Sequence, residues 1–260
     1  MPDHDGGDFY YDLVAQGYDH YLSGVDFGDL DFYQELIHKD GRPALELACG
    51  TGRLLLPLAE AGLTVHGLDS SDEMLAICRR KGEERGLSLT LHHQAMQHLG
   101  LAQRYGVVFC SVGSFSLLID DADVSRTLIA CREHFLPSGQ LVLAIKDFYR
   151  AEDFDDDSRG EWCLRREEVD SEGRSWRAFE RMVSEPGAPI VISEWRYELV
   201  RGGEVIGEQH HDSRLRCWTA GELASRMGDA GFRDVKLYQS YTDDLAELSA
   251  CDFVAVGRAD

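Results

Sequence analysis

The sequence predicts an α/β fold, in which helices cover a mostly parallel sheet. Antiparallel hairpins are inserted into this domain, in the second half of the chain. Between residues 44 and 148, short apolar runs alternate with amphipathic helical segments, a pattern typical of a parallel sheet covered on both faces. Between residues 162 and 218, apolar and polar residues instead alternate with a period of two, and the turns DSEG and RGGE separate the runs. This second pattern predicts two β-hairpins.

The composition disfavours several classes of partner. The chain has 260 residues, and 26 Lys and Arg against 47 Asp and Glu give a net charge of −21, which repels nucleic-acid phosphates and anionic lipid. Seven scattered cysteines without a CxxC pair suit a reducing compartment. Because the start of the chain is acidic and no apolar run is long enough for a membrane span, we expect a cytoplasmic protein.

Two helices are predicted before the first strand. The stretch FYYDLVAQGYDHYL places Tyr10, Val14, Tyr18 and Tyr21 on one helical face. The stretch DLDFYQELIHK repeats the period, and Gly41-Arg42-Pro43 ends it.

Strands and helices then alternate. Ser70 and Glu73 have the spacing of a capping box at the start of a helix, and Thr219 and Glu222 repeat that spacing. Pro137-Ser138-Gly139 is expected to end a helix before the next strand begins. We expect strands at 44–48, 63–69, 87–92, 105–112, 140–148, 232–240 and 251–258, and helices at 53–61, 71–84, 123–135 and 219–231.

The turn in ALELACGTGR raises the question of which ligand it holds. No Lys follows either glycine, so it is not a Walker A loop. The dinucleotide pattern needs a third glycine, but Leu55 or Arg53 stands at its place, depending on the starting residue. Glu46 near the end of the preceding strand would also repel a pyrophosphate. A nucleotide-dependent oxidoreductase is therefore disfavoured.

The same residues suit an adenosine that carries a cationic tail. Glu46 supplies a carboxylate on the first strand, and Gly50 and Gly52 leave the backbone bare. Asp69 ends the second strand, where its two oxygens can accept both ribose hydroxyls.

These stretches resemble class I S-adenosylmethionine (SAM)-dependent methyltransferases of the small-molecule type with an inserted antiparallel lid sheet. The resemblance runs through LELACGTGR, VHGLDSSDEML, HHQAMQHL, FCSVGSFSLL and LPSGQLVLAI. It implies a Rossmann-like sheet whose last strand is antiparallel, with SAM as cofactor and S-adenosylhomocysteine as product. It divides the chain into an N-terminal helical segment at 1–40, a cofactor-binding core at 41–148 and 217–260, and the inserted lid at 149–216.

The resemblance also implies roles for single residues. Glu46 lies under the methionyl end, Ser111 lines the methionine moiety, and Tyr18 closes over its carboxylate. The loop beneath the cofactor is formed by Ala48, Gly50 and Gly52. The ribose and adenine are met by Asp69, Ser70, Met74, Ala95 and Met96, with the two methionines on either side of the ring.

Two positions depart from the family pattern. Ala48 stands where the family usually has its first glycine, which is tolerable if its φ stays negative. No Asp lies near Ala95 for the adenine amino group, so adenine recognition rests on backbone groups and on Gln94 or Gln97.

The predicted activity is methyl transfer to N or O of a small molecule by in-line displacement. The alternative is a catalytically silent SAM-binding regulator or partner subunit of the same fold. No catalytic base is identified, and the histidines lack the i, i+4 spacing of a metal site. The hairpins offer an edge through which a homodimer could pair. Candidates for the substrate wall are Tyr21, Phe115, Phe148, Trp195 and His210.

Overall fold

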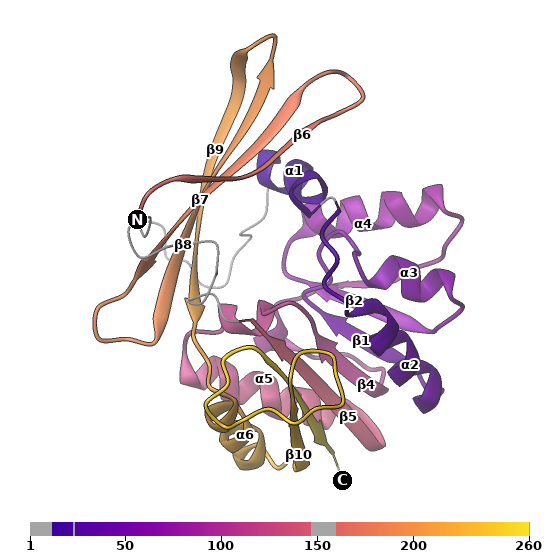
Figure 1. Ribbon diagram of the computed structural model, residues 1–260. Coiled ribbons are helices and arrows are strands. Elements are labelled where there is room, and N and C mark those ends of the chain that lie inside the picture. Colours follow the sequence, from indigo (N-terminus) through magenta and orange to yellow (C-terminus); the bar gives the residue numbers. More distant parts are fainter. Residues whose placement is uncertain (1–11, 23, 147–159, 260) are drawn as a thin grey trace.

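A computed structural model describes residues 12–22, 24–146 and 160–259. The described part of the chain forms two sheets and the helices that cover them (Figure 1). Their helices are α1 (Asp12–Leu22), α2 (Leu30–Asp40), α3 (Leu55–Glu60), α4 (Asp72–Glu84), η1 (Met96–His98), η2 (Ser114–Leu117), α5 (Asp121–Glu133) and α6 (Ala220–Asp229). Their strands are β1 (Ala44–Leu47), β2 (Val65–Asp69), β3 (Thr90–His93), β4 (Tyr105–Cys110), β5 (Phe135–Ile145), β6 (Cys163–Val169), β7 (Ser175–Ser184), β8 (Ile190–Arg201), β9 (Glu204–Arg216), β10 (Arg233–Tyr238) and β11 (Phe253–Arg258).

The larger sheet has the order β10-β11-β5-β4-β1-β2-β3. Its strands β1 to β5 pair in parallel, and β11 runs antiparallel to both of its neighbours. The predicted mostly parallel sheet with an antiparallel last strand is therefore confirmed. Its strand order reverses at β1, which lies between β2 and β4, and ligands of open α/β sheets bind at the carboxyl ends of the strands beside such a reversal.

Two apolar layers hold this sheet. Helices α2, α3 and α4 pack on one face, where Tyr33 and Leu55 join Phe109 in one buried cluster. On the other face α5 and α6 supply Leu128 and Leu223 to a second cluster. Strands β1 and β4 are buried along their whole length because both faces of the sheet are covered.

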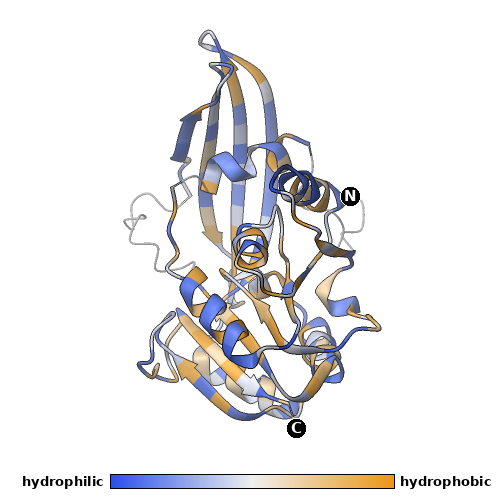
Figure 2. Ribbon diagram, turned by 90° about the vertical axis from the view of Figure 1, so that its right-hand side faces the viewer, coloured by the Kyte–Doolittle hydropathy of each residue, from blue (hydrophilic) through white to orange (hydrophobic). Residues whose placement is uncertain are grey.

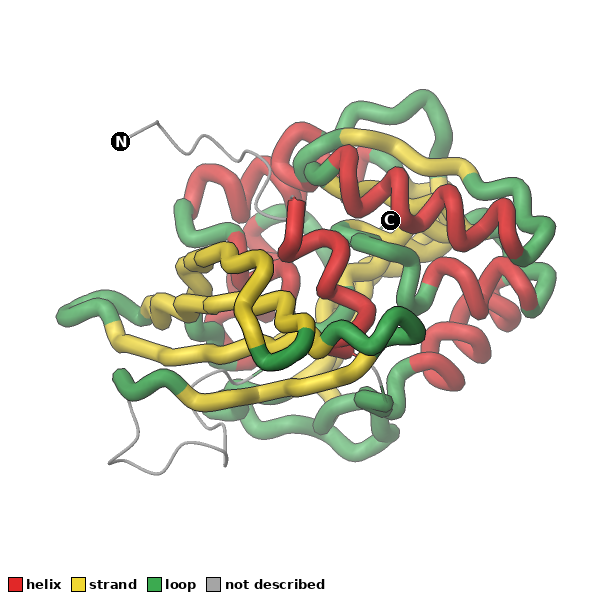
Figure 3. The backbone as a smooth tube through the Cα atoms, turned by 90° about the horizontal axis from the view of Figure 1, so that it is seen from above, coloured by secondary structure: helices red, strands yellow, loops and turns green. Residues whose placement is uncertain are grey.

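The second sheet, called here the lid sheet, consists of β6 to β9 in that order, all antiparallel. The turns DSEG and RGGE connect β6 to β7 and β8 to β9, which confirms the predicted hairpins. Residues of the lid strands alternate between polar and apolar (Figure 2). Seen from above, helices gather on the side of the large sheet, and the long lid strands extend beyond them (Figure 3).

Three local predictions are wrong. The cap of α4 is Ser71, whose side chain accepts from Met74 N, so the capping box predicted from Ser70 and Glu73 lies one residue too early. Strand β5 begins at Phe135, before the Pro-Ser-Gly stretch that we expected to precede it, and α5 correspondingly ends at Glu133. Strand β4 ends at Cys110 because Val112 turns to a φ of +47°. Hydrophobic periodicity does not show where the backbone turns at the end of a strand, so it predicts the limits of strands poorly. By contrast, Thr219 caps α6 as predicted.

Candidate active site

The glycine turn lies at the reversal in strand order, directly after β1. Its backbone is left-handed at Ala48, Gly50 and Gly52, with φ values of +54°, +54° and +87°. The condition that Ala48 keep a negative φ is therefore not met, and this alanine adopts a conformation that L-residues rarely take. A Cβ on Gly52 would lie 2.6 Å from Cys78 Sγ, whereas one on Gly50 would meet only Met74 Cε, at 3.5 Å. Gly52 is needed for packing against α4, and Gly50 keeps the turn open.

Asp69, at the end of β2, is fixed by backbone groups from two directions. Its Oδ2 accepts from Gly50 N at 2.8 Å, and its Oδ1 accepts from Ser71 N at 2.9 Å. The carboxylate therefore links the glycine turn to the start of α4. A carboxyl group held in this way is pre-organised to accept hydrogen bonds from a ligand.

Glu46 is a buried carboxyl group with an unsatisfied oxygen. Its residue is 2% exposed, and Oε2 has no hydrogen-bond partner within the described residues. Burial raises the pKa of Glu46 to about 8, although the charge of Arg53 opposes this rise. A buried acceptor without a partner is costly unless a ligand satisfies it. The position suits a cationic group with N–H donors, such as the ammonium at the amino-acid end of SAM.

Arg53 is a site residue that the sequence analysis did not identify. Its guanidinium donates to both carboxylate oxygens of Asp29, at 2.8 and 2.6 Å, and lies over the Phe27 ring at 4.6 Å. Asp29 stands at the N-cap of α2 but makes no side-chain capping bond, so its carboxylate serves Arg53 instead. The available signal was a basic residue directly after the GTG turn.

Helix α1 brings Tyr18 to this edge of the sheet. Burial raises the pKa of Tyr18 to about 12, and the groups whose charges act on it include Arg53, Asp69 and Glu46. Its hydroxyl therefore stays protonated and can donate to an anionic ligand group. The structure thus brings Tyr18 near Glu46 and Asp69, and the contact of these three residues with a cofactor stays a prediction.

Asp19 fastens α1 to the large sheet. Its Oδ1 accepts from Thr51 Oγ1 at 2.6 Å, and its Oδ2 pairs with Lys81 Nζ at 2.8 Å. One acidic side chain therefore joins α1 to the glycine turn and to α4. This contact was also missed, because an acidic residue on a polar helix face gives no sequence signal of its partners.

The other residues predicted at the cofactor lie around the same edge. Met74 is buried in the first turn of α4, and Met96 is buried in η1 within one of the core clusters. Ala95 precedes η1 and is half-buried. Ser70 follows β2, and its carbonyl is 2.8 Å from His93 Nε2. Ser111 follows β4 and is 8% exposed. Contact of these residues with a cofactor stays a prediction.

Two of the substrate-wall predictions are wrong, and one lies outside the described residues. Phe115 is fully buried, with its ring 6.0 Å from that of Trp218, and has no surface for a substrate. His210 is exposed beside Trp162 and pairs with Glu208. Phe148 falls in the part of the chain that is not described.

The orientation of the lid sheet explains why His210 faces away. Tyr21 of α1 contacts Trp195 edge to face, with ring centroids 4.7 Å apart. Trp195 is in register with His211, whereas His210 pairs with the next residue, Arg196. Because successive side chains alternate between faces, His211 lies on the α1 side and His210 on the opposite side.

Ion pairs join the end of β9 at Arg216, called here the foot of the lid sheet, to helices α5 and α6. Arg216, at the end of β9, binds Asp121 at 2.5 Å and Glu222 at 2.6 Å, and its guanidinium lies 4.0 Å from the Trp218 ring centre. The lid sheet therefore meets the remainder of the fold both at α1 and at its foot.

Comparison with known proteins identifies the domain that carries this site. Residues 44–139 match the methyltransferase domain family. The dTDP-3-amino-3,6-dideoxy-alpha-D-glucopyranose N,N-dimethyltransferase of Streptomyces fradiae is 34% identical over 137 residues, which are 51% of this chain and 50% of that protein. The chain thus spans half the length of this curated relative.

Solved structures resemble the whole chain. The sugar N-methyltransferase KedS8 from Streptoalloteichus sp. aligns with a TM-score of 0.75 at 21% identity, over 97% of this chain and 95% of that one. SAM-bound CalS10, an amino pentose methyltransferase from Micromonospora echinaspora, aligns with a TM-score of 0.68 at 20% identity, over 97% and 99%. At these identities the likeness shows the fold. In the described residues, no helix combines the length and apolarity that a membrane crossing requires.

Proposed function

We propose that this chain, which carries a class I SAM-dependent methyltransferase domain, transfers a methyl group to N or O of a small molecule by in-line displacement. The observation that carries the proposal is the unpartnered oxygen Oε2 of the buried Glu46, set beside Asp69 at the reversal in strand order. Bound SAM supplies a methyl group already activated by its sulfonium, so the protein needs mainly to align the acceptor and exclude water.

The site residues divide the cofactor between them. Glu46 would meet the ammonium, and Arg53 with the Tyr18 hydroxyl would meet the carboxylate. Asp69 would accept from the ribose hydroxyls. The turn at Gly50 leaves room for the ligand to approach the backbone, and Met74, Met96 and Ala95 would surround the adenine.

An amino sugar is the first acceptor class to test. The Streptomyces fradiae relative and two of the structural neighbours are named for sugars or amino sugars. Residues 149–216 would close over the acceptor, together with the N-terminal segment 1–40, leaving 41–148 and 217–260 as the core.

We further propose a cytoplasmic location and no nucleic-acid partner. No disulfide joins the cysteines of the described residues, which suits a reducing compartment, and the net charge is −21. A homodimer could pair through a lid edge strand, β6 or β9.

Calorimetric titration with SAM and S-adenosylhomocysteine tests the cofactor. Micromolar binding, about −8 kcal/mol, is expected for the wild type and should be lost in Asp69→Ala. Because Asp69 also holds the glycine turn, Asp69→Asn is compared, with the fold of each variant checked by circular dichroism. Absence of binding to the wild type would contradict the proposal. Tight binding without turnover on any of a panel of amines and alcohols would favour the silent regulator.

A further inference from the structure

The side of the lid sheet that faces α1 carries buried polar groups. Ser193, Glu180 and Ser213 are 2%, 5% and 6% exposed. Ser193 Oγ donates to Glu180 Oε1 at 2.6 Å, and Arg165 Nε donates to Glu180 Oε2 at 3.1 Å. A cover that only excluded water would be apolar, since burying polar groups costs free energy. Polar groups on this face therefore point to contact with a polar substrate.

His211 belongs to this face by two independent observations. Along β9 the odd-numbered residues from Gly207 to Leu215 are half-buried or buried, whereas the even-numbered residues from Glu208 to Arg214 are exposed. His211 is also in register with Trp195, which contacts Tyr21 of α1. One of its ring nitrogens, Nε2, lies 2.9 Å from Ser213 Oγ, so the ring orientation is held by a neighbour on the same face.

The course of β9 places His211 over the carboxyl edge of the large sheet. Before His211, Gln209 Oε1 accepts from Val14 N of α1, at 3.2 Å. After it, Arg216 binds Asp121, and β9 contacts η2, the segment that follows β4. Because α1 is fastened to the glycine turn after β1, His211 lies between the anchors above β1 and β4. Figure 1 shows β9 descending past α1 toward α5.

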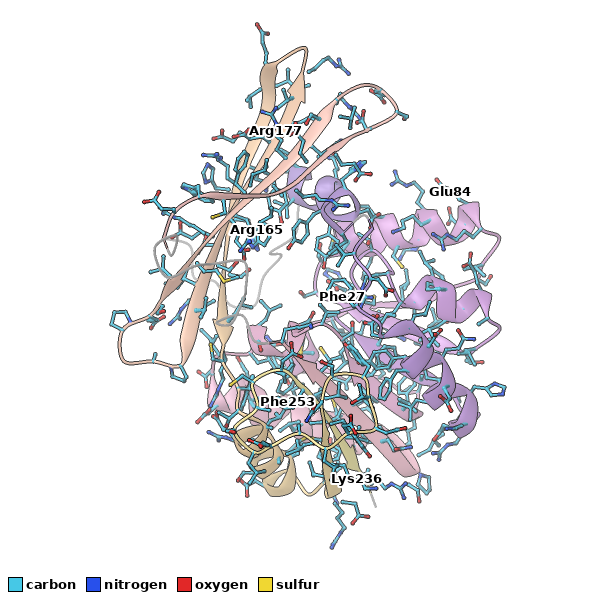
Figure 4. The ribbon with its side chains drawn as sticks, viewed as in Figure 1. Phe27, Glu84, Arg165, Arg177, Lys236 and Phe253 are labelled. Carbon is cyan, nitrogen blue, oxygen red and sulfur yellow. The ribbon has the colours of Figure 1, made fainter. Side chains whose placement is uncertain are left out.

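The side-chain view shows how one labelled residue of the lid sheet and one near the candidate cofactor residues lie. Figure 4 labels Arg165 on the part of the lid sheet that faces the large sheet, and Phe27 on the opposite side. Phe27 is the ring beneath Arg53. The polar face of the lid sheet and the candidate cofactor residues therefore face one another.

We infer that His211 accepts the proton that the methyl acceptor releases, and that Ser213 is a positioning residue for its ring. The inference rests on the proposed function. The N–H or O–H proton of the acceptor moves to a ring nitrogen of His211, and the bonding pair stays on the acceptor atom. The imidazole becomes an imidazolium and later returns the proton to water. The acceptor atom then has the lone pair that methyl transfer needs.

The surroundings of His211 favour its neutral form. Burial lowers the pKa of His211, and the charge of Asp212 opposes this shift. Other ionisable groups on this side of the described lid sheet include the Arg165–Glu180 pair, whose two charges offset one another, and also Tyr21 and His20 of α1, Tyr197 of β8, Arg166 and Glu168. A neutral imidazole at pH 7 is the form that can accept a proton.

The test uses adjacent histidines on opposite faces, His211→Gln against His210→Gln. With a dTDP-linked amino sugar as acceptor, His211→Gln should lose about 100-fold or more in kcat at pH 7, and His210→Gln should match the wild type. SAM affinity should be unchanged in both. The kcat of His211→Gln should rise with pH, because an increasing fraction of the acceptor is then deprotonated without help. Ser213→Ala should lower kcat more than it changes KM, and should shift the pH profile.

Nuclear magnetic resonance titration of the histidine rings supplies a reading that needs no turnover. The His211 ring should be neutral at pH 7, and its signals are assigned from their loss in His211→Gln. Amide exchange in β6–β9 checks that the lid sheet stays folded in both variants. Equal activity of the two variants, or a His211 ring that is cationic at pH 7, would overturn the inference. Failure of the wild type to bind SAM would instead contradict the proposed function.

Discussion

The two sheets of this protein are stabilised in different ways. Strands β1 and β4 of the large sheet are buried at every position, between two apolar layers. The lid sheet buries mainly one face, and several of its side chains form partly exposed ion pairs, including Arg177 with Glu167 and Arg181 with Glu194. Exposed ion pairs contribute little to stability. The difference implies that the large sheet sets global stability, and that the lid sheet depends on its contacts with α1 and its foot.

The largest expected effect is on the free energy of unfolding, and it comes from making the same Leu→Ala substitution in each sheet. Leu45→Ala in β1 removes a fully buried side chain and should cost about 2–5 kcal/mol in the free energy of unfolding. Leu199→Ala in β8, where the side chain is only half-buried, should cost about 1 kcal/mol. Urea unfolding measures both. Equal losses would show that the two sheets share one core.

Contact between α1 and the lid sheet is tested by Gly17→Ala. A Cβ there would lie 2.9 Å from Trp176 Cε3, so the substitution should cost about 1–3 kcal/mol of overpacking. Amide exchange should quicken in β6–β9 and stay unchanged in the large sheet. Gly228→Ala in α6 is the matched control, because a Cβ there meets nothing within 4 Å, and it should stabilise by about 0.5–1 kcal/mol. If Gly17→Ala quickened amide exchange equally in both sheets, the two sheets would not be separate in stability.

The buried glutamates of the two sheets should respond differently to pH. Because the pKa of Glu46 is raised to about 8, SAM must displace its proton at lower pH. Affinity should therefore fall about tenfold for each pH unit below 8. The ligand-free protein should lose stability as pH rises from about 4.5 to 8, since the native state then holds the extra proton.

Calorimetry across this pH range should show that Glu46→Gln removes the dependence. Glu180→Gln, in which the lid carboxylate already has Arg165 and Ser193 as partners, should leave it in place. The ionisation of SAM itself is common to all three proteins and cancels in the comparison. If SAM affinity depended on pH in the same way in the wild type and in Glu46→Gln, the ammonium of SAM would bind at another group.

The smallest effect concerns backbone strain. Ala48 has a φ of +54° beside the candidate site, whereas the β6–β7 hairpin of the lid sheet uses Gly173 at +74°. Ala48→Gly should stabilise by about 0.5–1 kcal/mol, and Gly173→Ala should destabilise by about 1 kcal/mol. Thermal unfolding measures both changes. A destabilised Ala48→Gly would mean that the Ala48 methyl group packs usefully.

Hydrophobic period and local spacing were enough to predict the two sheets and the edge where the site lies. The change of hydrophobic period from helix and buried strand to strict alternation separated the large sheet from the lid sheet, because periodicity follows directly from which face is buried. Glu46, the glycine turn and Asp69 were found because a strand that runs into a turn has a defined end, and local spacing places such residues at one edge.

Which side chains from distant segments meet depends on how the elements pack in three dimensions. The Asp29–Arg53 pair and the contacts of Asp19 with Thr51 and Lys81 join separate elements, and no local pattern encodes such partners. Alternation puts His210 and His211 on opposite faces of β9, but a strand has the same period in either orientation, so the choice of the inward side chain required α1 to be packed on one face. Phe115 looked available in the sequence and is buried because Trp218, about a hundred residues later, packs against it.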